Sequence, residues 1–345
     1  MTTFVFPTIS AQAEERTAGE RVPRERVLDD QVAAAVRSGF SSRPKRLPPW
    51  LFYDAAGSRL FDEITSRPEY YLTRTERSIL AAHAEAMIEH AAEGARLRIT
   101  ELGAGSADKT RLLLKAAVAR QGTVIYEPLD VSASALDAAK ERIEREIAGV
   151  AGASQVMDYT QGNGRGLKLK PTEAGERRLV LYIGSSIGNF ELPEAMRLLR
   201  RVRAGLNPGD GLLLGVDLVK DEVTLLAAYD DVAGVTADFN LNLLTRLNRE
   251  LGAEFYLESF QHRAVWNERE SRIEMHLESR VEQKVSLPAL NLEVDFAQGE
   301  TIHTENSYKY RPGQAEAMMA EAGFAAAGRW TDERGWFSVC LGLAE

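Results

Sequence analysis

The run at residues 97–106, LRITELGAGS, constrains the fold of this chain more than any other stretch. Its apolar first half has the composition of a buried strand, and it ends in Glu101 followed by two glycines, Gly103 and Gly105. A segment with a helical pattern follows at 108–118. A strand, a tight turn and a helix N-terminus in this order are typical of α/β domains that seat a nucleotide-like ligand.

Strand and helix patterns alternate from residue 97 to residue 218. The patterns predict strands at 97–102, 122–129, 155–157, 178–183 and 212–218, and helices at 108–118, 133–147 and 192–206. Such alternation implies a parallel sheet that is covered by helices on both faces. We therefore expect a Rossmann-like α/β fold for this part of the chain.

The alternation ends after residue 218. One helix at 235–251 is followed by several strand-like segments, and a helix at 314–322 and an apolar strand at 337–343 then return to the sheet. We interpret 219–309 as an α+β insertion. The predicted division is a flexible N-terminus at 1–25, a main domain at 79–218 plus 310–345, and a substrate-binding lobe at 26–78 plus 219–309.

A long helix is predicted at 73–93, just before the first strand of the alternation. Thr73 can cap it, and Glu76 lies three residues further on, which is the spacing of a capping box. The apolar residues that follow recur at helical spacing. We therefore assign Glu76 to the helix start.

Composition excludes several kinds of site and partner. The chain has 42 basic and 51 acidic residues, a net charge of −9, which disfavours nucleic acid as a partner. Cys340 is the single cysteine, so neither an intrachain disulfide nor a cysteine zinc cluster is possible, and the five histidines lack metal-ligand spacing. No apolar run reaches the roughly 20 residues of a membrane span. We expect a cytoplasmic protein with no metal, no membrane association and no obligate protein partner.

The glycine turn distinguishes three kinds of cofactor. A dinucleotide fingerprint requires a third glycine where this chain has Asp108, and the Lys-Ser/Thr end of a P-loop is absent after Gly105. S-adenosylmethionine has no phosphates and needs fewer glycines. Asp130 and Asp158 follow the next two strands, where they suit the ribose hydroxyls and the adenine amine. A single aspartate there is more often a helix cap, so the joint pattern carries the inference of S-adenosylmethionine.

Several ordered blocks resemble one enzyme family. They are 53–62 (YDAAGSRLFD), 68–71 (PEYY), 101–111 (ELGAGSADKTR), 184–189 (GSSIGN), 229–231 (YDD), 272–275 (RIEM) and 304–311 (TENSYKYR). They are similar to the histidine Nα-methyltransferases of ergothioneine biosynthesis. The resemblance runs from about residue 53 to the C-terminus. It implies a Rossmann-like class I methyltransferase sheet with an inserted α+β lobe, and trimethylation of free L-histidine to hercynine.

The resemblance also implies a set of site residues. The cofactor would be held by residues matching Gly103, Lys109, Asp130, Asp158 and Tyr159, beside the second turn glycine, Gly105. The amino-acid backbone would be held by Asn189 and Tyr229 with help from Tyr53, and these three are the candidate catalytic residues. The imidazole would be recognised by Glu305 and Ser307, in a pocket that also includes Tyr70, Gly184 and Met275.

The residues themselves allow simpler interpretations. Glu305 and Ser307 share one face of an extended segment. Such a pair could bind the two imidazole nitrogens, but it could equally belong to a solvated sheet face. Tyr229 could be a surface tyrosine, Met275 a core residue and Lys109 an exposed one. A carboxylate opposite the ring favours histidine, and another free aromatic amino acid such as tryptophan is the alternative acceptor.

Overall fold

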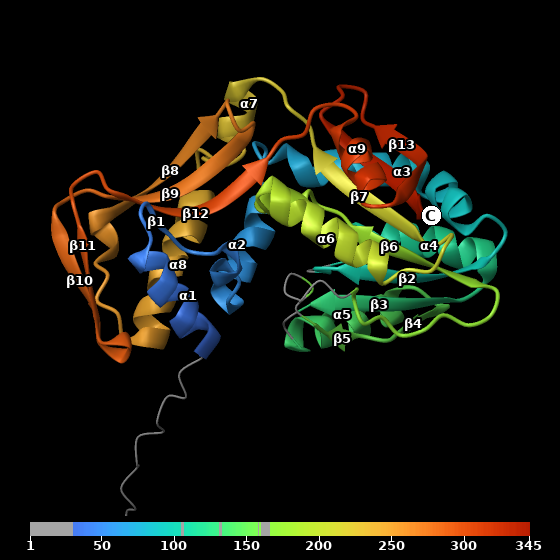
Figure 1. Cartoon of the computed structure of the whole chain (residues 1–345), viewed down its shortest axis with the longest axis horizontal. Helices are drawn as coiled ribbons and strands as arrows, with labels where there is room; N and C mark the ends of the chain where they lie inside the picture. The colour runs from blue at the N-terminus through green and yellow to red at the C-terminus, as the bar shows by residue number, and fades with distance from the viewer. Residues whose placement is uncertain (1–29, 105–106, 131–132, 158, 160–165) are drawn as a thin grey trace, which may run out of the picture.

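The computed structural model describes residues 30–104, 107–130, 133–157, 159 and 166–345. Gly105, Asp158 and the N-terminal 25 residues therefore lie outside the described part. Within it, the chain forms a large mixed sheet, a smaller sheet and the helices that cover them (Figure 1). None of the described helices is both long enough and apolar enough to cross a membrane.

The large sheet has the strand order β13-β14-β7-β6-β2-β3-β4, with β5 paired to β3. All neighbours from β7 to β4 run parallel, whereas β14 is antiparallel to both β7 and β13. The expected Rossmann-like sheet is thus confirmed. Its strands are β2 (Arg96–Leu102), β3 (Val124–Asp130), β4 (Val150–Gly152), β5 (Gln155–Val156), β6 (Glu176–Tyr182), β7 (Gly211–Asp217), β13 (Phe324–Thr331) and β14 (Phe337–Ala344).

Helices cover both faces of this sheet. Alternate residues of one strand enter different cores: Leu179 and Leu181 pack beneath one helix layer, and Val180 and Tyr182 pack beneath the other. The first layer contains α3 (Tyr71–Ala92), α4 (Thr110–Gln121) and α5 (Ala133–Glu146), and the second contains α6 (Leu192–Ala204) and α9 (Gln314–Glu321). Burial on both faces explains why the strands read as continuous apolar runs.

Strand β13 was not predicted from the sequence. Its segment, FAAAGRWT, is rich in alanine and contains a glycine, both of which have low strand propensity. It forms because it pairs along β14 at the edge of the sheet. The pairing therefore comes from the tertiary fold rather than from a local preference.

The smaller lobe is built from two distant parts of the chain. Its four-stranded sheet has the order β1-β12-β9-β8, beside the β10–β11 hairpin. The strands are β1 (Lys45–Arg46), β8 (Phe260–Asn267), β9 (Arg272–Ser279), β10 (Gln283–Leu287), β11 (Leu292–Phe296) and β12 (Thr301–Tyr308). Its helices are α1 (Asp30–Ser41), α2 (Ala55–Thr65), α7 (Glu222–Ala227) and α8 (Val235–Leu251), with short 3-10 turns η1 (Pro49–Phe52), η2 (Ser186–Asn189), η3 (Leu257–Ser259) and η4 (Pro288–Leu290) nearby.

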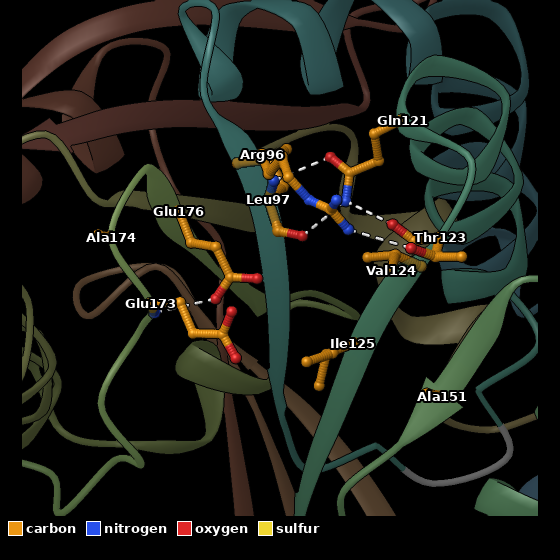
Figure 2. Close-up of a pocket in the computed structure, with 10 residues that line it drawn as sticks. All are labelled: Arg96, Leu97, Gln121, Thr123, Val124, Ile125, Ala151, Glu173, Ala174 and Glu176. Carbon is orange, nitrogen blue, oxygen red and sulfur yellow. Dashed lines mark hydrogen bonds between the residues drawn. The ribbon is translucent and has the colours of Figure 1, made fainter.

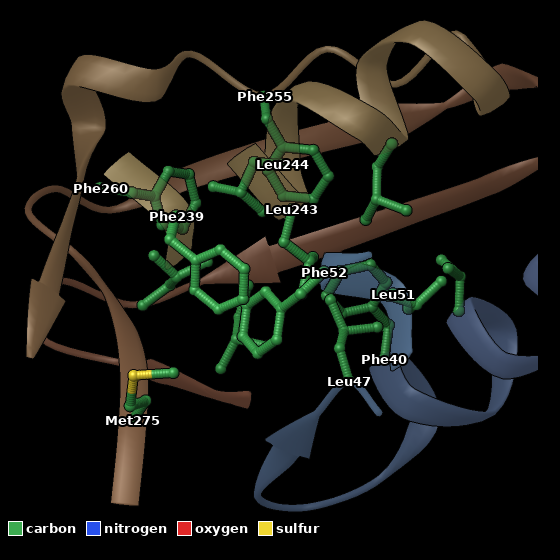
Figure 3. Close-up of a cluster of buried hydrophobic side chains, with 14 of the residues drawn as sticks. Phe40, Leu47, Leu51, Phe52, Phe239, Leu243, Leu244, Phe255, Phe260 and Met275 are labelled. Atoms are coloured by element: carbon green, nitrogen blue, oxygen red, sulfur yellow. The ribbon is translucent and has the colours of Figure 1, made fainter. Parts of the chain in front are cut away.

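One hydrophobic core joins these two parts of the chain. Phe52 stacks on Phe239 with ring centroids 4.6 Å apart, so η1 packs against α8 (Figure 3). Helix α3 enters both cores, with Tyr71 and Leu72 in the core of the small lobe and Ile79 in that of the large sheet. The predicted domain boundary at 78/79 thus falls within a continuous helix, and the division itself stays a prediction.

The predicted start of α3 is wrong. The helix begins at Tyr71, and Tyr70 at the N-cap makes no side-chain capping bond. Glu76 is fully buried, and its carboxylate accepts the backbone N–H of Gly184 at 2.9 Å and pairs with Lys109. The capping-box spacing was therefore coincidental, because distant partners hold the carboxylate.

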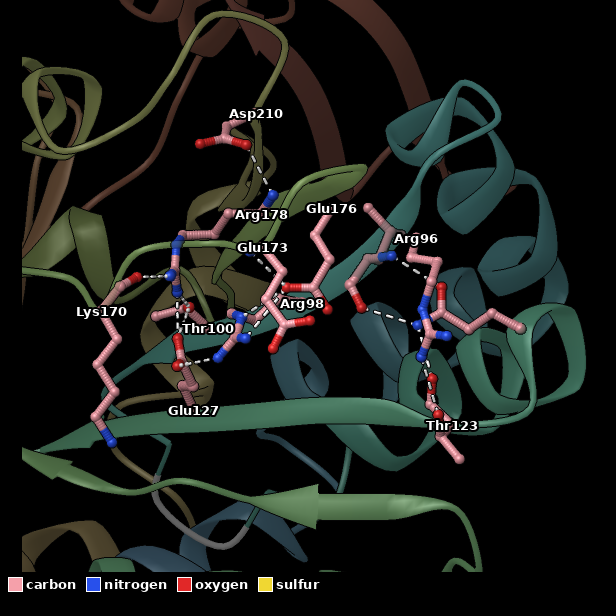
Figure 4. A network of polar contacts seen from close by, with 12 residues as sticks. Arg96, Arg98, Thr100, Thr123, Glu127, Lys170, Glu173, Glu176, Arg178 and Asp210 are labelled. Atoms are coloured by element: carbon pink, nitrogen blue, oxygen red, sulfur yellow. Dashed lines mark hydrogen bonds and ion pairs between the residues drawn. The ribbon is translucent and has the colours of Figure 1, made fainter.

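A buried ionic network connects the central strands (Figure 4). The Glu127 carboxylate on β3 accepts from Arg98 on β2 at 3.0 Å, from the Thr100 hydroxyl at 3.0 Å, and from Arg178 on β6. Arg178 also donates to the backbone carbonyl of Lys170. The three strands and the 166–175 segment are thus connected by charges that lie almost entirely out of water.

A cavity of about 260 Å³ lies beside this network, at the amino-terminal end of β2 and β3 (Figure 2). Its polar side chains bond within the protein: Arg96 donates to the Thr123 hydroxyl at 3.0 Å, and Gln121 bridges to the backbone of Leu97. Ligands of open α/β sheets bind at the opposite, carboxyl ends of the strands. The cavity is therefore remote from the candidate site described below.

We predict that Glu127→Ala destabilises the protein by about 3–5 kcal/mol, because it leaves two buried guanidinium groups without their shared carboxylate. The measurement is equilibrium unfolding in urea. The control is Glu293→Ala, which removes a 66% exposed partner of Lys284 and should change stability by less than about 0.5 kcal/mol. Equal losses for the two variants would show that the buried network adds no stability.

Candidate active site

Four strand ends of the large sheet meet at one edge. Gly103 follows β2, Asp130 ends β3, Gly184 lies two residues after β6, and Asp217 ends β7. The amide of Gly103 donates to the carbonyl of Leu129 at 2.9 Å, which fixes the glycine turn beside the end of β3. Because these strands are parallel, their carboxyl ends form the edge where such sheets bind ligands.

The backbone at Gly103 has a conformation and a neighbour that only glycine tolerates. Its φ is +68°, and a Cβ there would lie 2.7 Å from the hydroxyl of Tyr159. The Tyr159 ring packs edge-on against Tyr182 at the end of β6, with centroids 6.0 Å apart. Glycine is thus required both by the left-handed conformation and by the space that Tyr159 fills. Gly103 and Asp130 thus lie at the ends of adjacent strands, β2 and β3, and Tyr159 packs against Gly103.

Lys109 is held by a buried acid rather than pointing freely into solvent. Its ammonium pairs with Glu76, and its side chain keeps only 19% of its exposure. A Cβ at Gly184 would lie 3.2 Å from Nζ, so this glycine leaves room for the lysine. A Cβ at Gly215 would approach the Glu76 carboxylate to 2.1 Å. Two glycines therefore make space for an ion pair between the cofactor side and the loop after β6.

Glu101, at the end of β2, holds the segment after the glycine turn through buried hydrogen bonds. Its carboxylate accepts from the Thr110 hydroxyl at 2.6 Å and from the Tyr126 hydroxyl. Burial raises the pKa of Glu101 to about 7, and the two hydroxyl donors oppose that rise. The acid at the end of β2 thus fixes the first turn of α4 to the sheet.

Glu305 lies on the opposite side of the site, on β12 of the small lobe. Its Oε1 accepts from the Asn189 amide at 3.1 Å, and Asn189 ends the η2 turn beyond Gly184. Met275 on β9 is the cross-strand partner of Glu305 and is 2% exposed. Cross-strand partners share a face, so Met275 lies both in the core and beside the carboxylate. Burial raises the pKa of Glu305 to about 7.

Ser307, two residues further along β12, bonds to Tyr229. Their hydroxyl oxygens are 2.6 Å apart, and Tyr229 is 5% exposed, so the surface interpretation of this tyrosine is wrong. Lys309 donates to the Tyr229 hydroxyl at 2.8 Å and to the Ser307 hydroxyl at 2.9 Å. It also pairs with Asp217 at 2.8 Å. The end of β7 is thereby connected to the face that carries Glu305.

Tyrosine rings surround Glu305. Tyr70 packs edge-on against Tyr229 with centroids 6.2 Å apart, and Tyr53 packs against Phe61 and Phe239. Tyr53 is 45% exposed, yet the surrounding protein desolvates its hydroxyl, and this and the charge of Glu305 raise its pKa. Tyr159 also acts on Tyr53 electrostatically. Tyr53 is therefore within electrostatic reach of both Glu305 and Tyr159.

The described contacts join the predicted site residues in small groups: Gly103 with Tyr159, Gly184 with Lys109, Asn189 and Met275 with Glu305, and Tyr70 and Ser307 with Tyr229. Glu76, Asp217 and Lys309 contact these residues, although the sequence analysis assigned none of the three to the site. Asp217 carried a usable signal, since it ends a strand like Asp130 does. The sequence signal for Lys309 was weaker: it lies two positions beyond Ser307, which would place it on the same face. Glu76 carried none. Among the described residues, no group of three or more His, Cys, Asp or Glu could hold a metal ion.

The sheet order, the glycine turn and the acids at the strand ends define a class I methyltransferase. The sequence model described as "Histidine-specific methyltransferase, SAM-dependent" matches residues 32–343, and the chain belongs to this family.

Several known proteins are similar to this chain. "Histidine N-alpha-methyltransferase" of Mycolicibacterium smegmatis is 46% identical over 89% of this chain and 93% of that protein. "Ergothioneine biosynthesis protein 1" of Neurospora crassa is 31% identical over 84% of this chain and 32% of that longer protein. A solved S-adenosylmethionine-dependent methyltransferase from Clostridium acetobutylicum, 10% identical, superposes with a TM-score of 0.45 over 83% of this chain and 98% of that one.

Glu305→Gln should stabilise the protein near pH 8 and do so much less near pH 5. Glu305 has a pKa of about 7 in the fold against an ordinary value of 4.5, so the folded protein binds its proton more tightly. Stability therefore falls as pH rises through that window, and glutamine avoids the loss, on the order of 1 kcal/mol or more. The measurement is urea unfolding at both pH values. A gain of equal size at both would show that ionisation of Glu305 is not the cause.

Proposed function

We propose that this protein transfers methyl groups from S-adenosylmethionine to the α-amino group of free L-histidine, three times in succession, and so makes hercynine for ergothioneine biosynthesis. The observation that carries the proposal is the pair Glu305 and Ser307. They lie two apart on β12 and face the same side. Glu305 accepts from Asn189 of the loop that follows β6, and Ser307 bonds to Tyr229. A carboxylate and a hydroxyl at this spacing match the two nitrogens of one imidazole ring.

Asn189 and Tyr229 are proposed to hold the backbone of the amino acid. An amide both donates and accepts, so Asn189 can bind the carboxylate and the amine of one zwitterion. Its Nδ2 donates to Glu305 at 3.1 Å, which supports a role beside the residue that would bind the imidazole. Gly184 begins this loop, and Tyr70, Met275 and Tyr53 are proposed to line the pocket of the amino acid.

The cofactor residues are proposed to divide between its two ends. Gly103, Asp130 and Tyr159 would hold the adenosine part, together with Gly105 and Asp158 beyond the described residues. Lys109 would bind the carboxylate of the methionine part, because its ammonium is kept at the strand ends by Glu76. S-adenosylmethionine supplies an electrophilic methyl group on a sulfonium sulfur.

Each transfer forms one N–CH₃ bond, breaks one S–CH₃ bond and releases one proton from the ammonium group. The protein must therefore bind the amine and let its proton leave. A neighbouring cationic sulfur disfavours a second cation, which promotes loss of that proton. The product grows into a methylammonium, and the faces of Tyr53 and Tyr70 can stabilise such a cation. Positioning and electrostatics are thus the contributions of this chain.

Cytoplasmic localisation and the absence of an obligate protein partner remain part of the proposal. Both the methyl donor and the acceptor are small molecules. Cys340, the single cysteine, is buried in the core, which is compatible with a reducing compartment. Locating a tagged full-length chain in cells and measuring its mass in solution would test both points.

The purified chain, given S-adenosylmethionine and L-histidine, should accumulate Nα-trimethylhistidine and S-adenosylhomocysteine in a ratio of one to three. Mass spectrometry of the reaction measures both products. Parallel reactions with tryptophan, tyrosine and phenylalanine test the alternative acceptors. Binding of the cofactor without any methylation of histidine would refute the proposed substrate, and methylation of tryptophan alone would replace it.

Glu305→Ala should raise the KM for histidine on the order of a hundredfold, because the ring N–H loses a charged acceptor. The affinity for S-adenosylhomocysteine should stay the same, since Glu305 lies on the small lobe. Steady-state kinetics and calorimetry measure the two effects. Glu278→Ala, on neighbouring β9 and bonded to Gln261 and Arg263, is the control. Equal losses of both affinities would make Glu305 a structural residue.

A further inference from the structure

A buried lysine controls the hydroxyl groups that face the acceptor. We propose that Lys309 is a positioning residue that sets specificity. By donating to the hydroxyls of both Ser307 and Tyr229, it makes this hydroxyl pair donate a hydrogen bond to the ring of the bound amino acid. The ring must then carry an unprotonated nitrogen. The inference rests on the proposed function, because it explains how that same site chooses its amino acid.

The contacts of Lys309 account for all of its donors. Nζ lies 2.9 Å from the hydroxyl of Ser307, 2.8 Å from that of Tyr229 and 2.8 Å from a carboxylate oxygen of Asp217. Its side chain is 0% exposed. An ammonium has three N–H groups and no lone pair. Each of the three is therefore directed at one oxygen, and both hydroxyl oxygens act as acceptors.

The hydroxyl protons can then be counted. Ser307 and Tyr229 each have one, and their oxygens are 2.6 Å apart, so one hydroxyl donates to the other. Neither can donate to Lys309, which accepts nothing. One hydroxyl proton is left over. Because the pair lies on the face of β12 that carries Glu305, this remaining proton is the one available to a bound ring.

The site thus presents one donor and one acceptor to the ring. The donor is the remaining hydroxyl proton, and the acceptor is the carboxylate of Glu305. Neutral imidazole has one N–H and one bare nitrogen, and satisfies both. Indole has an N–H but no acceptor nitrogen, so it leaves the buried hydroxyl proton without a partner. Sites that leave such a group unpaired reject the poorer ligand strongly.

Asp217 keeps Lys309 in place from behind. Its carboxylate also accepts from Lys220 at 2.6 Å and from the Tyr71 hydroxyl at 2.7 Å. Burial lowers the pKa of Lys309, and Asp217 and Glu305 oppose that change. When Lys309 is replaced, Asp217 still has Lys220 and Tyr71 as partners. The substitution therefore removes the hydrogen bonds to the Ser307 and Tyr229 hydroxyls without leaving a buried carboxylate unpaired.

Lys309→Met is the direct test. With S-adenosylhomocysteine bound, the Kd for histidine should rise on the order of tenfold or more, and the preference for histidine over tryptophan should fall by a similar factor. Affinity for S-adenosylhomocysteine should not change. Lys220→Met is the matched control, since Lys220 contacts Asp217 and Tyr71 but neither Ser307 nor Tyr229. Its preference for histidine should equal that of the wild type.

A double-mutant cycle with Ser307→Ala separates this role from a structural one. If Lys309 acts through the hydroxyl pair, Lys309→Met should cost much less histidine affinity in the Ser307→Ala background than in the wild type. Additive losses would overturn the proposal. If Lys309→Met does not fold, Ser307→Ala alone decides: it should lose the preference for histidine, and an unchanged preference would overturn the proposal.

The test also separates this inference from the proposed function. If the wild-type protein methylates histidine and Lys309→Met keeps the same preference for histidine over tryptophan, only the role of Lys309 is refuted. Wild-type protein that does not methylate histidine refutes the proposed function, and the inference fails with it.

Discussion

The buried carboxylate of Asp217 is the contact on which the arrangement of the site depends. It ends β7 of the large sheet, accepts from Tyr71 at the start of α3 and pairs with Lys309 just beyond β12. Its backbone carbonyl accepts from Tyr310 at 2.8 Å, which continues the same junction. Because the side chain is fully buried, its attraction for these partners is weakly screened. The faces that would bind cofactor and acceptor are thereby held in a fixed relation.

Other charges at the site show what burial costs. Glu305 and Glu101 both have a pKa raised to about 7 by desolvation, so each destabilises the fold when ionised. Glu101 receives two hydroxyl donors that reduce this cost, whereas the described bond to Glu305 comes from Asn189. A carboxylate with few internal partners is suited to bind a donor from a ligand. Glu305 is therefore expected to lower the stability of the fold and to strengthen binding of the ligand.

Local patterns predicted the main sheet well and the small lobe only in part. Buried strands such as β2 and β6, and the helices between them, have strong periodicity that tertiary contacts do not override. The alanine-rich β13 was missed because it forms by pairing with β14. Glu76 was assigned to a helix cap because its partners, Lys109 and Gly184, lie far away in sequence. The resemblance to the family, rather than periodicity, supplied Tyr70, Asn189 and Met275.

The sequence alone determined the parallel sheet and the type of cofactor, since apolar runs, a glycine turn and an acid at a strand end are local features. It also placed Glu305 and Ser307 on one face, because strand alternation fixes that spacing. Only the tertiary structure decided which groups those side chains meet. Lys309 reaches Asp217, Tyr229 and Ser307 through contacts between segments that are distant along the chain. Such partners depend on how the two sheets pack, and no local preference encodes that.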